Sequence, residues 1–139
     1  MLLLTRRERF NAAHKLYQEE WSAEKNAEVF GKCANKNWHG HNYELFVTVK
    51  GEINPLTGFI IDLKRLSEVL QEKVVEVLDH KNLNLDVPFL KGKMASTEVL
   101  AVSIWNEIEK EVIELGAFLH SVKLNETENN FVEYFGPNA

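Results

Sequence analysis

Cysteine, proline and glycine are scarce in this sequence, and each shortage excludes a class of protein. The single cysteine, Cys33, excludes a fold held together by disulfides within the chain. With only three prolines and seven glycines in 139 residues, the sequence has no linker, low-complexity segment or internal repeat. We therefore expect one folding unit over residues 1–139.

Long apolar runs and an excess of positive charge are also missing. The apolar Met1–Leu4 is followed at once by the charged segment Arg6–Arg9, too soon for a signal peptide or a membrane span. A net charge of −5 argues against a broad nucleic-acid surface, which needs a dense field of lysine and arginine. We expect a cytoplasmic protein with neither a membrane nor a nucleic acid as partner.

What is present is an order of strand, strand, helix, helix, strand, strand. A two-residue period predicts a first strand over residues 2–14 and, after a long loop, a second that includes His39 and His41. Apolar residues three and four apart predict a first helix over residues 62–78 and a second over residues 96–115.

The last segment is predicted to be a hairpin with its turn at residues 128–130 and its final strand at residues 131–135. Alternation predicts that one face of its first strand carries Phe118, His120, Val122, Leu124 and Glu126. Both helices then cover one face of an antiparallel four-stranded sheet, an α+β fold of order ββααββ. The open edges of such a sheet favour oligomerisation.

Three histidines are candidate metal ligands. His39 and His41 flank Gly40, so on a strand they project to the same side, and His14 can add a third nitrogen from the neighbouring strand. Three protein ligands with an open fourth position are typical of catalytic zinc. The alternative is that these histidines are core or surface residues with ordinary hydrogen bonds.

Cys33 and the pair Asp79–His80 are candidates for proton transfer. A thiol beside a metal-bound substrate can act as a base, although most free cysteines are small buried hydrophobes. An adjacent carboxylate and imidazole can relay protons, but Asp79 could equally cap a turn while His80 meets the end of the first helix.

Glu126 is the last candidate, because it shares the apolar face of its strand and needs a partner there. Its carboxylate could accept two parallel N–H donors from a cyclic amidine, or it could be satisfied by a lysine or by backbone amides. Nothing pairs His120 with the other candidates, and we take it as structural.

Five segments together resemble the 6-pyruvoyltetrahydropterin synthase family, and the likeness covers nearly the whole chain. The matching segments, in order along the chain, are Phe10–His14, Phe30–Cys33 leading through Trp38 to His39–Tyr43, Leu78–Leu83, Ser96–Glu98, and Glu126–Thr127. The resemblance implies the tunnelling fold, in which three subunits join their sheets into a barrel and two trimers stack into a homo-hexamer. It also implies active sites that lie between subunits.

The resemblance further implies a role for each matching residue. His14, His39 and His41 would bind Zn²⁺, Cys33 would be the general base, and Asp79 and His80 of a neighbouring subunit would transfer protons. Glu126 would anchor the pterin, and Ser96 and Thr97 would face its ring, although their order differs slightly from the usual pair.

The implied reaction is that of a carbon–oxygen lyase. It converts 7,8-dihydroneopterin triphosphate to 6-pyruvoyltetrahydropterin with elimination of triphosphate and without an external reductant. Zinc would hold the side-chain hydroxyls and acidify the adjacent C–H, which Cys33 deprotonates. The triphosphate could bring Mg²⁺ with it, and we expect a local basic rim drawn from Lys15, Lys32, Lys36 and Lys81.

The sister enzyme 6-carboxytetrahydropterin synthase, of queuosine biosynthesis, is the main alternative. Two features are more similar to the pyruvoyl type, namely the five residues between Cys33 and His39 and the long stretch over residues 79–88. Two further alternatives are a zinc-containing pterin-binding protein without turnover and a structural zinc closed by Cys33 as fourth ligand.

Overall fold

The fold is seen in a computed structural model that describes residues 1–138. Its helices and strands in sequence order are β1 (Leu3–His14), α1 (Ala23–Phe30), a 3₁₀ turn (Gly31–Ala34), β2 (His39–Lys50), α2 (Leu63–Leu70), a π-helical turn (Gln71–Val75), α3 (Glu76–Leu78), β3 (Lys81–Asn82), a second 3₁₀ turn (Pro88–Leu90), α4 (Thr97–Glu114), β4 (Phe118–Asn125) and β5 (Phe131–Tyr134).

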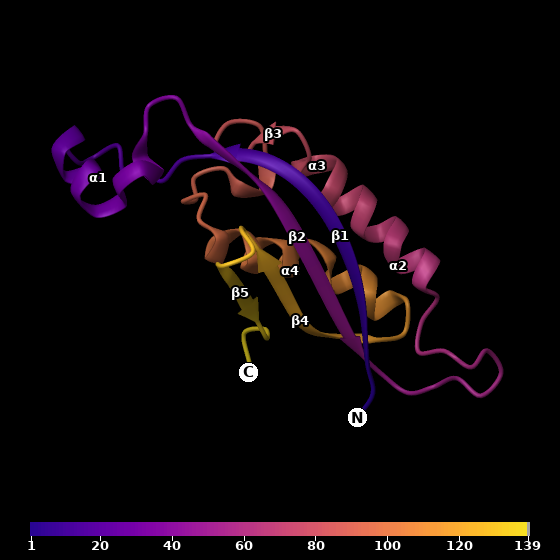
Figure 1. The fold of residues 1–139 in the computed structure, drawn as a ribbon. Helices are drawn as coiled ribbons and strands as arrows, with labels where there is room; N and C mark the ends of the chain where they lie inside the picture. Colours follow the sequence, from indigo (N-terminus) through magenta and orange to yellow (C-terminus); the bar gives the residue numbers. More distant parts are fainter. Residues whose placement is uncertain (139) are drawn as a thin grey trace.

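The strands form one mixed sheet in the order β3-β1-β2-β4-β5 (Figure 1). Its four longer strands are antiparallel and match the four that the sequence predicts. The additional strand, β3, is two residues long and pairs in parallel with β1 at Ala12 and Ala13. Two residues are too few to show a period, so no sequence pattern could have revealed β3.

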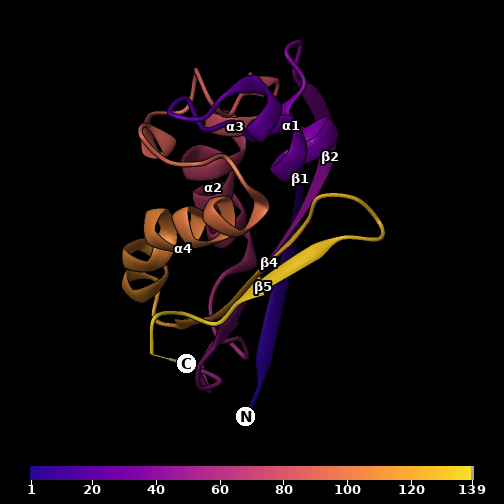
Figure 2. The same ribbon diagram turned by 90° about the vertical axis from the view of Figure 1, so that its left-hand side faces the viewer.

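The helices α2, α3 and α4 all cover one face of the sheet, as predicted (Figure 2). Asp62 caps the start of α2, where its side chain accepts a hydrogen bond from the Lys64 N–H. Ser96 caps α4 in the same way, with the Val99 N–H as donor. Alternate residues of β1 and β2 point into the core beneath these helices, and those buried there include Phe10, Ala12, Tyr43, Leu45, Val47 and Val49. No helix within residues 1–138 is both long enough and apolar enough to cross a membrane.

The prediction of which side chains share a face of β4 is wrong at the start of that strand. Thr48 pairs with Ser121 but Val49 pairs with Leu119, so the ladder contains a bulge at His120. The extra residue reverses the alternation, which buries Leu119 and leaves Phe118 59% exposed.

The predicted loop between the first two strands contains α1, which Ser22 caps. Asn26, fully buried in α1, ties this segment together by accepting a hydrogen bond from the Gln18 N–H and donating to the Gln18 and Ser22 carbonyls. The Leu16 N–H then donates to the Cys33 carbonyl over 2.7 Å. This bond holds Cys33 beside the end of β1, where the candidate site begins.

Candidate active site

The three candidate metal ligands lie together at one end of the central hairpin. The register of β1 and β2 places His14 opposite His39 and Ala12 opposite His41. All three side chains project to the helix-covered face, and one ring nitrogen from each lies within 4.8 Å of the others. The prediction from the strand period that the three histidines project to the same side is therefore confirmed, and their ring nitrogens lie close together.

The hydrogen bonds of these rings fit a metal ion. His14 is almost fully buried, and its Nδ1 lies 2.7 Å from the Ala95 carbonyl. Since a carbonyl only accepts, Nδ1 carries the proton and Nε2 offers its lone pair. Among the residues the structure describes, this Nε2, the His39 Nδ1 and the His41 Nε2 are buried without a hydrogen-bond partner. One ion with nitrogen ligands would satisfy all three atoms.

Burial lowers the pKa of each of the three histidines, and it is the largest cause in every case. The nearby imidazoles lower these pKa values further, because each disfavours a second positive charge. Glu126 acts in the opposite direction on all three. The net result is three neutral rings at neutral pH, the form that binds a metal.

Acidification should therefore release a metal bound at this cluster only below the ordinary histidine pKa of 6.5. Protons then compete for the ligand nitrogens. The metal-free protein should also lose stability as pH falls from 6.5 through the lowered pKa values, because the unfolded chain takes up protons first. Metal content after dialysis at stepped pH and thermal unfolding of the metal-free protein test both effects. Stability that rises on acidification would show that these pKa values are not lowered.

A cavity of about 290 Å³ reaches the histidine cluster at His14 and is also lined by four more predicted residues. Those lining it include His14, Cys33, Ser96, Thr97 and Glu126. The Thr97 hydroxyl donates to Glu126 Oε2 over 2.6 Å. The two carboxylate oxygens of Glu126 lie 3.8 and 3.9 Å from the Nε2 atoms of His14 and His41. The carboxylate thus lies between a hydroxyl donor and the metal-ligand candidates.

Ser96 and Thr97 differ in what their hydroxyls do. The Ser96 hydroxyl accepts the Val99 N–H as the N-cap of α4, whereas the Thr97 hydroxyl binds Glu126. Ala95, which precedes them, holds His14 through its carbonyl. The start of α4 therefore positions both the most buried ligand candidate and the carboxylate.

The Asp79–His80 pair is built on the edge of β1. Asp79 Oδ1 accepts the Asn11 N–H over 2.9 Å, and the His80 N–H donates to the Asn11 carbonyl over 2.6 Å. Asp79 Oδ2 lies 2.8 Å from His80 Nδ1, while His80 adopts a left-handed backbone with φ of 60°. The Asn11 N–H, followed by His80, lowers the pKa of Asp79, so an ionised carboxylate orients the imidazole.

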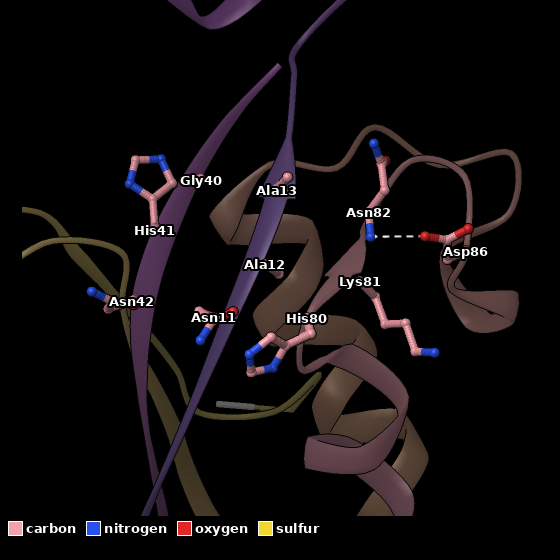
Figure 3. Close-up of a pocket in the computed structure, with 10 residues that line it drawn as sticks. All are labelled: Asn11, Ala12, Ala13, Gly40, His41, Asn42, His80, Lys81, Asn82 and Asp86. Carbon is pink, nitrogen blue, oxygen red and sulfur yellow. Dashed lines mark hydrogen bonds between the residues drawn. The ribbon is translucent and has the colours of Figure 1, made fainter. Parts of the chain in front are cut away.

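Within residues 1–138, this pair does not line the Cys33 cavity. His80 borders a separate hollow of about 660 Å³, whose lining also includes Asn11, Gly40, His41 and Lys81 (Figure 3). Figure 3 shows the His41 ring on β2 and the His80 ring on the turn before β3, not directed toward one another. A single subunit therefore provides two half-sites, one with the thiol and carboxylate and one with the imidazole pair.

Sequence reasoning missed one contributor to the site and one of its close neighbours. The Ala95 carbonyl could not have been found, because a backbone atom leaves no signal in the residue type. Tyr43 lies on the same face of β2 as His39 and His41, but alternation alone predicts only that it is a core strand residue. It is 1% exposed, and burial together with the nearby Glu126 charge raises its pKa.

Fold and site together define an α+β protein whose central hairpin carries a three-histidine cluster able to hold a metal, next to a carboxylate and a thiol. The family model for 6-pyruvoyl tetrahydropterin synthase matches residues 3–137. The chain therefore belongs to the 6-pyruvoyl tetrahydropterin synthase family.

Individual relatives agree with this assignment. The 6-pyruvoyl tetrahydrobiopterin synthase of Pongo abelii is 47% identical over 133 residues, which are 96% of this chain and 90% of the relative. That of Dictyostelium discoideum is 46% identical over 135 residues, covering 97% and 96%. The structure of Caenorhabditis elegans 6-pyruvoyl tetrahydropterin synthase superposes with a TM-score of 0.89 at 34% identity, covering 97% of this chain and 95% of that one. The fold is the tunnelling fold of this family.

Proposed function

We propose that this protein is a zinc-dependent lyase that converts 7,8-dihydroneopterin triphosphate to 6-pyruvoyltetrahydropterin with elimination of triphosphate. The observation that carries the proposal is the cavity in which Cys33, Thr97 and Glu126 meet His14, one member of the three-histidine cluster. Relatives named 6-pyruvoyl tetrahydrobiopterin synthase, nearly half identical over almost the whole chain, support it.

His14, His39 and His41 would hold the zinc, and the Ala95 carbonyl would keep the His14 ring in the required tautomer. When bound, zinc supplies a Lewis acid that polarises the oxygens of the substrate side chain and makes the adjacent C–H more acidic.

Glu126 would bind the pterin through its two carboxylate oxygens. The amidine and amino groups of a pterin present two parallel N–H donors, which a carboxylate can accept side by side. The Thr97 hydroxyl already holds Oε2 at 2.6 Å, so one edge of the carboxylate is fixed before the ligand enters. This arrangement would direct the pterin side chain toward His14 and Cys33, which line the same cavity.

Cys33, as the thiolate, would take the proton from the acidified C–H of the substrate. The electron pair left behind passes to the pterin ring, which is reduced while the substituent on it is oxidised, so the substrate supplies both halves of the redox change. The C–O bond to the triphosphate then breaks, and triphosphate leaves with the bonding electrons. The Asp79–His80 pair, in which the carboxylate orients the imidazole, would carry the protons that these steps require.

We further propose that the complete site forms between subunits of a homo-hexamer. The exposed edge of β5 and the edge at the short strand β3 leave backbone groups available for pairing with neighbouring sheets. Joining edges in a ring would bring the Asp79–His80 half-site of one subunit to the cavity of the next. This accounts for the separation of the two half-sites within a subunit.

Mixed oligomers test that arrangement. Cys33→Ala and His80→Ala proteins should each be nearly inactive, but unfolding and refolding them together should restore part of the activity, because some sites then receive an intact thiol and an intact imidazole. The measurement is turnover of the mixture against each variant refolded alone. If both groups came from the same subunit, the mixture would be as inactive as its parts.

Product analysis tests the reaction itself. Purified zinc-loaded protein incubated with 7,8-dihydroneopterin triphosphate should yield 6-pyruvoyltetrahydropterin and one equivalent of triphosphate, identified by mass spectrometry. A 6-carboxy product accompanied by acetaldehyde would instead indicate 6-carboxytetrahydropterin synthase activity. Binding of the substrate without any product would indicate a pterin-binding protein.

A further inference from the structure

Tyr43 carries a hydroxyl that the proposed mechanism does not use. The residue is 1% exposed, and its ring stacks on Phe10 with the centroids 4.9 Å apart and the planes 15° from parallel. In the part of the chain that the structure describes, the hydroxyl is buried and has no hydrogen-bond partner. A buried hydroxyl without a partner costs free energy, so a ligand or a movement that satisfies it is favoured.

Tyr43 lies close enough to Glu126 for the carboxylate charge to raise the pKa of the phenol. Leu45 pairs with Leu124 and Glu44 with Asn125, where the ladder ends, so Tyr43 and Glu126 are the next residues on the two chains and alternate to the same face as Leu45 and Leu124. Tyr43 shares its face with His41, whose ring centroid lies 5.7 Å away. Residues directly opposite on a shared face of an antiparallel pair are close enough for their side chains to interact.

The Glu126 carboxylate has room for such a donor. Two oxygens provide about four acceptor positions, of which two would receive the pterin N–H groups and one receives the Thr97 hydroxyl. Thr97 binds Oε2, whereas Oε1 receives no hydroxyl from the described residues and lies 3.9 Å from His41 Nε2. One acceptor position therefore remains on the side of the carboxylate that Thr97 does not hold.

We propose that Tyr43 is a positioning residue for pterin binding, whose hydroxyl donates to the Glu126 carboxylate in the complex. Together with Thr97 it fixes both ends of the carboxylate, so that the plane of its oxygens faces the pterin N–H donors. The stack on Phe10 holds the phenol ring in place, which makes the donor part of a rigid support. This inference rests on the proposed function, because it concerns how that same site holds its pterin.

The substitution Tyr43→Phe removes only the hydroxyl and keeps the stack on Phe10. With zinc-loaded protein, fluorescence titration with neopterin, an oxidised pterin that does not react, should show affinity roughly 10-fold or more weaker than wild type, as expected for losing a hydrogen bond to a charged acceptor. In turnover assays the KM should rise while kcat changes little, because the lost interaction is made equally in the ground and transition states. Zinc content should stay at the wild-type level.

The matched control is Tyr134→Phe, since Tyr134 lies on β5 with its ring 5.3 Å from that of Trp105. Its neopterin affinity and KM should equal those of wild type. Unchanged neopterin affinity and KM in Tyr43→Phe, with a higher melting temperature from removing an unsatisfied hydroxyl, would overturn the inference and leave the proposed function standing. Wild-type protein that binds no pterin at all would overturn both.

Discussion

Replacing Cys33 by alanine should lower kcat by roughly 10²- to 10⁴-fold, the usual contribution of a general base. The thiol lines the cavity that also contains Glu126 and Thr97, and it is the only thiol in the sequence. No other sulfur can replace it, so the loss of proton abstraction should be nearly complete. Steady-state turnover with 7,8-dihydroneopterin triphosphate measures the effect.

The fold and the metal should survive this change. The bond that ties Cys33 to the end of β1 uses its backbone carbonyl, which alanine keeps. Circular dichroism and zinc content should therefore match wild type, and neopterin should still bind. Full activity in Cys33→Ala would favour a base elsewhere in the site, and reduced zinc content would favour Cys33 as a metal ligand.

Replacing His41 by alanine should remove the zinc and with it the activity. Loss of a group that merely supports a ligand commonly costs about 10- to 100-fold in metal affinity, and loss of the ligand itself should cost at least as much. His41 contributes one of three unpartnered buried nitrogens among the described residues, and two imidazoles cannot complete a three-ligand site. Zinc per subunit after dialysis against a chelator is the measurement.

His120→Ala is the matched control for a lost imidazole. His120 lies at the bulge of β4, where its ring packs against Phe135 with the centroids 5.8 Å apart. Its zinc content and turnover should equal those of wild type. Equal zinc retention by the His41 and His120 variants would contradict the assignment of His41 as a ligand.

The parts of the site that follow from local periodicity could be predicted from sequence. His39 and His41 lie two residues apart on a clearly alternating strand, so their common direction followed from the pleat alone. The extent of α4, predicted over residues 96–115 and found at Thr97–Glu114, followed from its apolar spacing. The same rule misplaced Phe118 and His120, because a bulge breaks the period without a mark in the sequence.

The parts that depend on distant contacts could not be predicted in this way. Asp79 and His80 are held by the backbone N–H and carbonyl of Asn11, 68 positions before Asp79, and these two atoms leave no signal in the residue type of Asn11. The same holds for the Ala95 carbonyl that orients His14 across the fold. The roles of these residues came from resemblance to a family, whereas their supports became visible only in the folded protein.

The proposed function depends on a zinc ion held by three imidazoles with a place left for substrate oxygen. X-ray absorption at the zinc edge of the purified protein tests it most directly. We predict one zinc per subunit with nitrogen and oxygen neighbours at about 2.0–2.1 Å and no sulfur neighbour. Protein without stoichiometric zinc, or a sulfur shell at about 2.3 Å that would mark Cys33 as a fourth ligand, would contradict it.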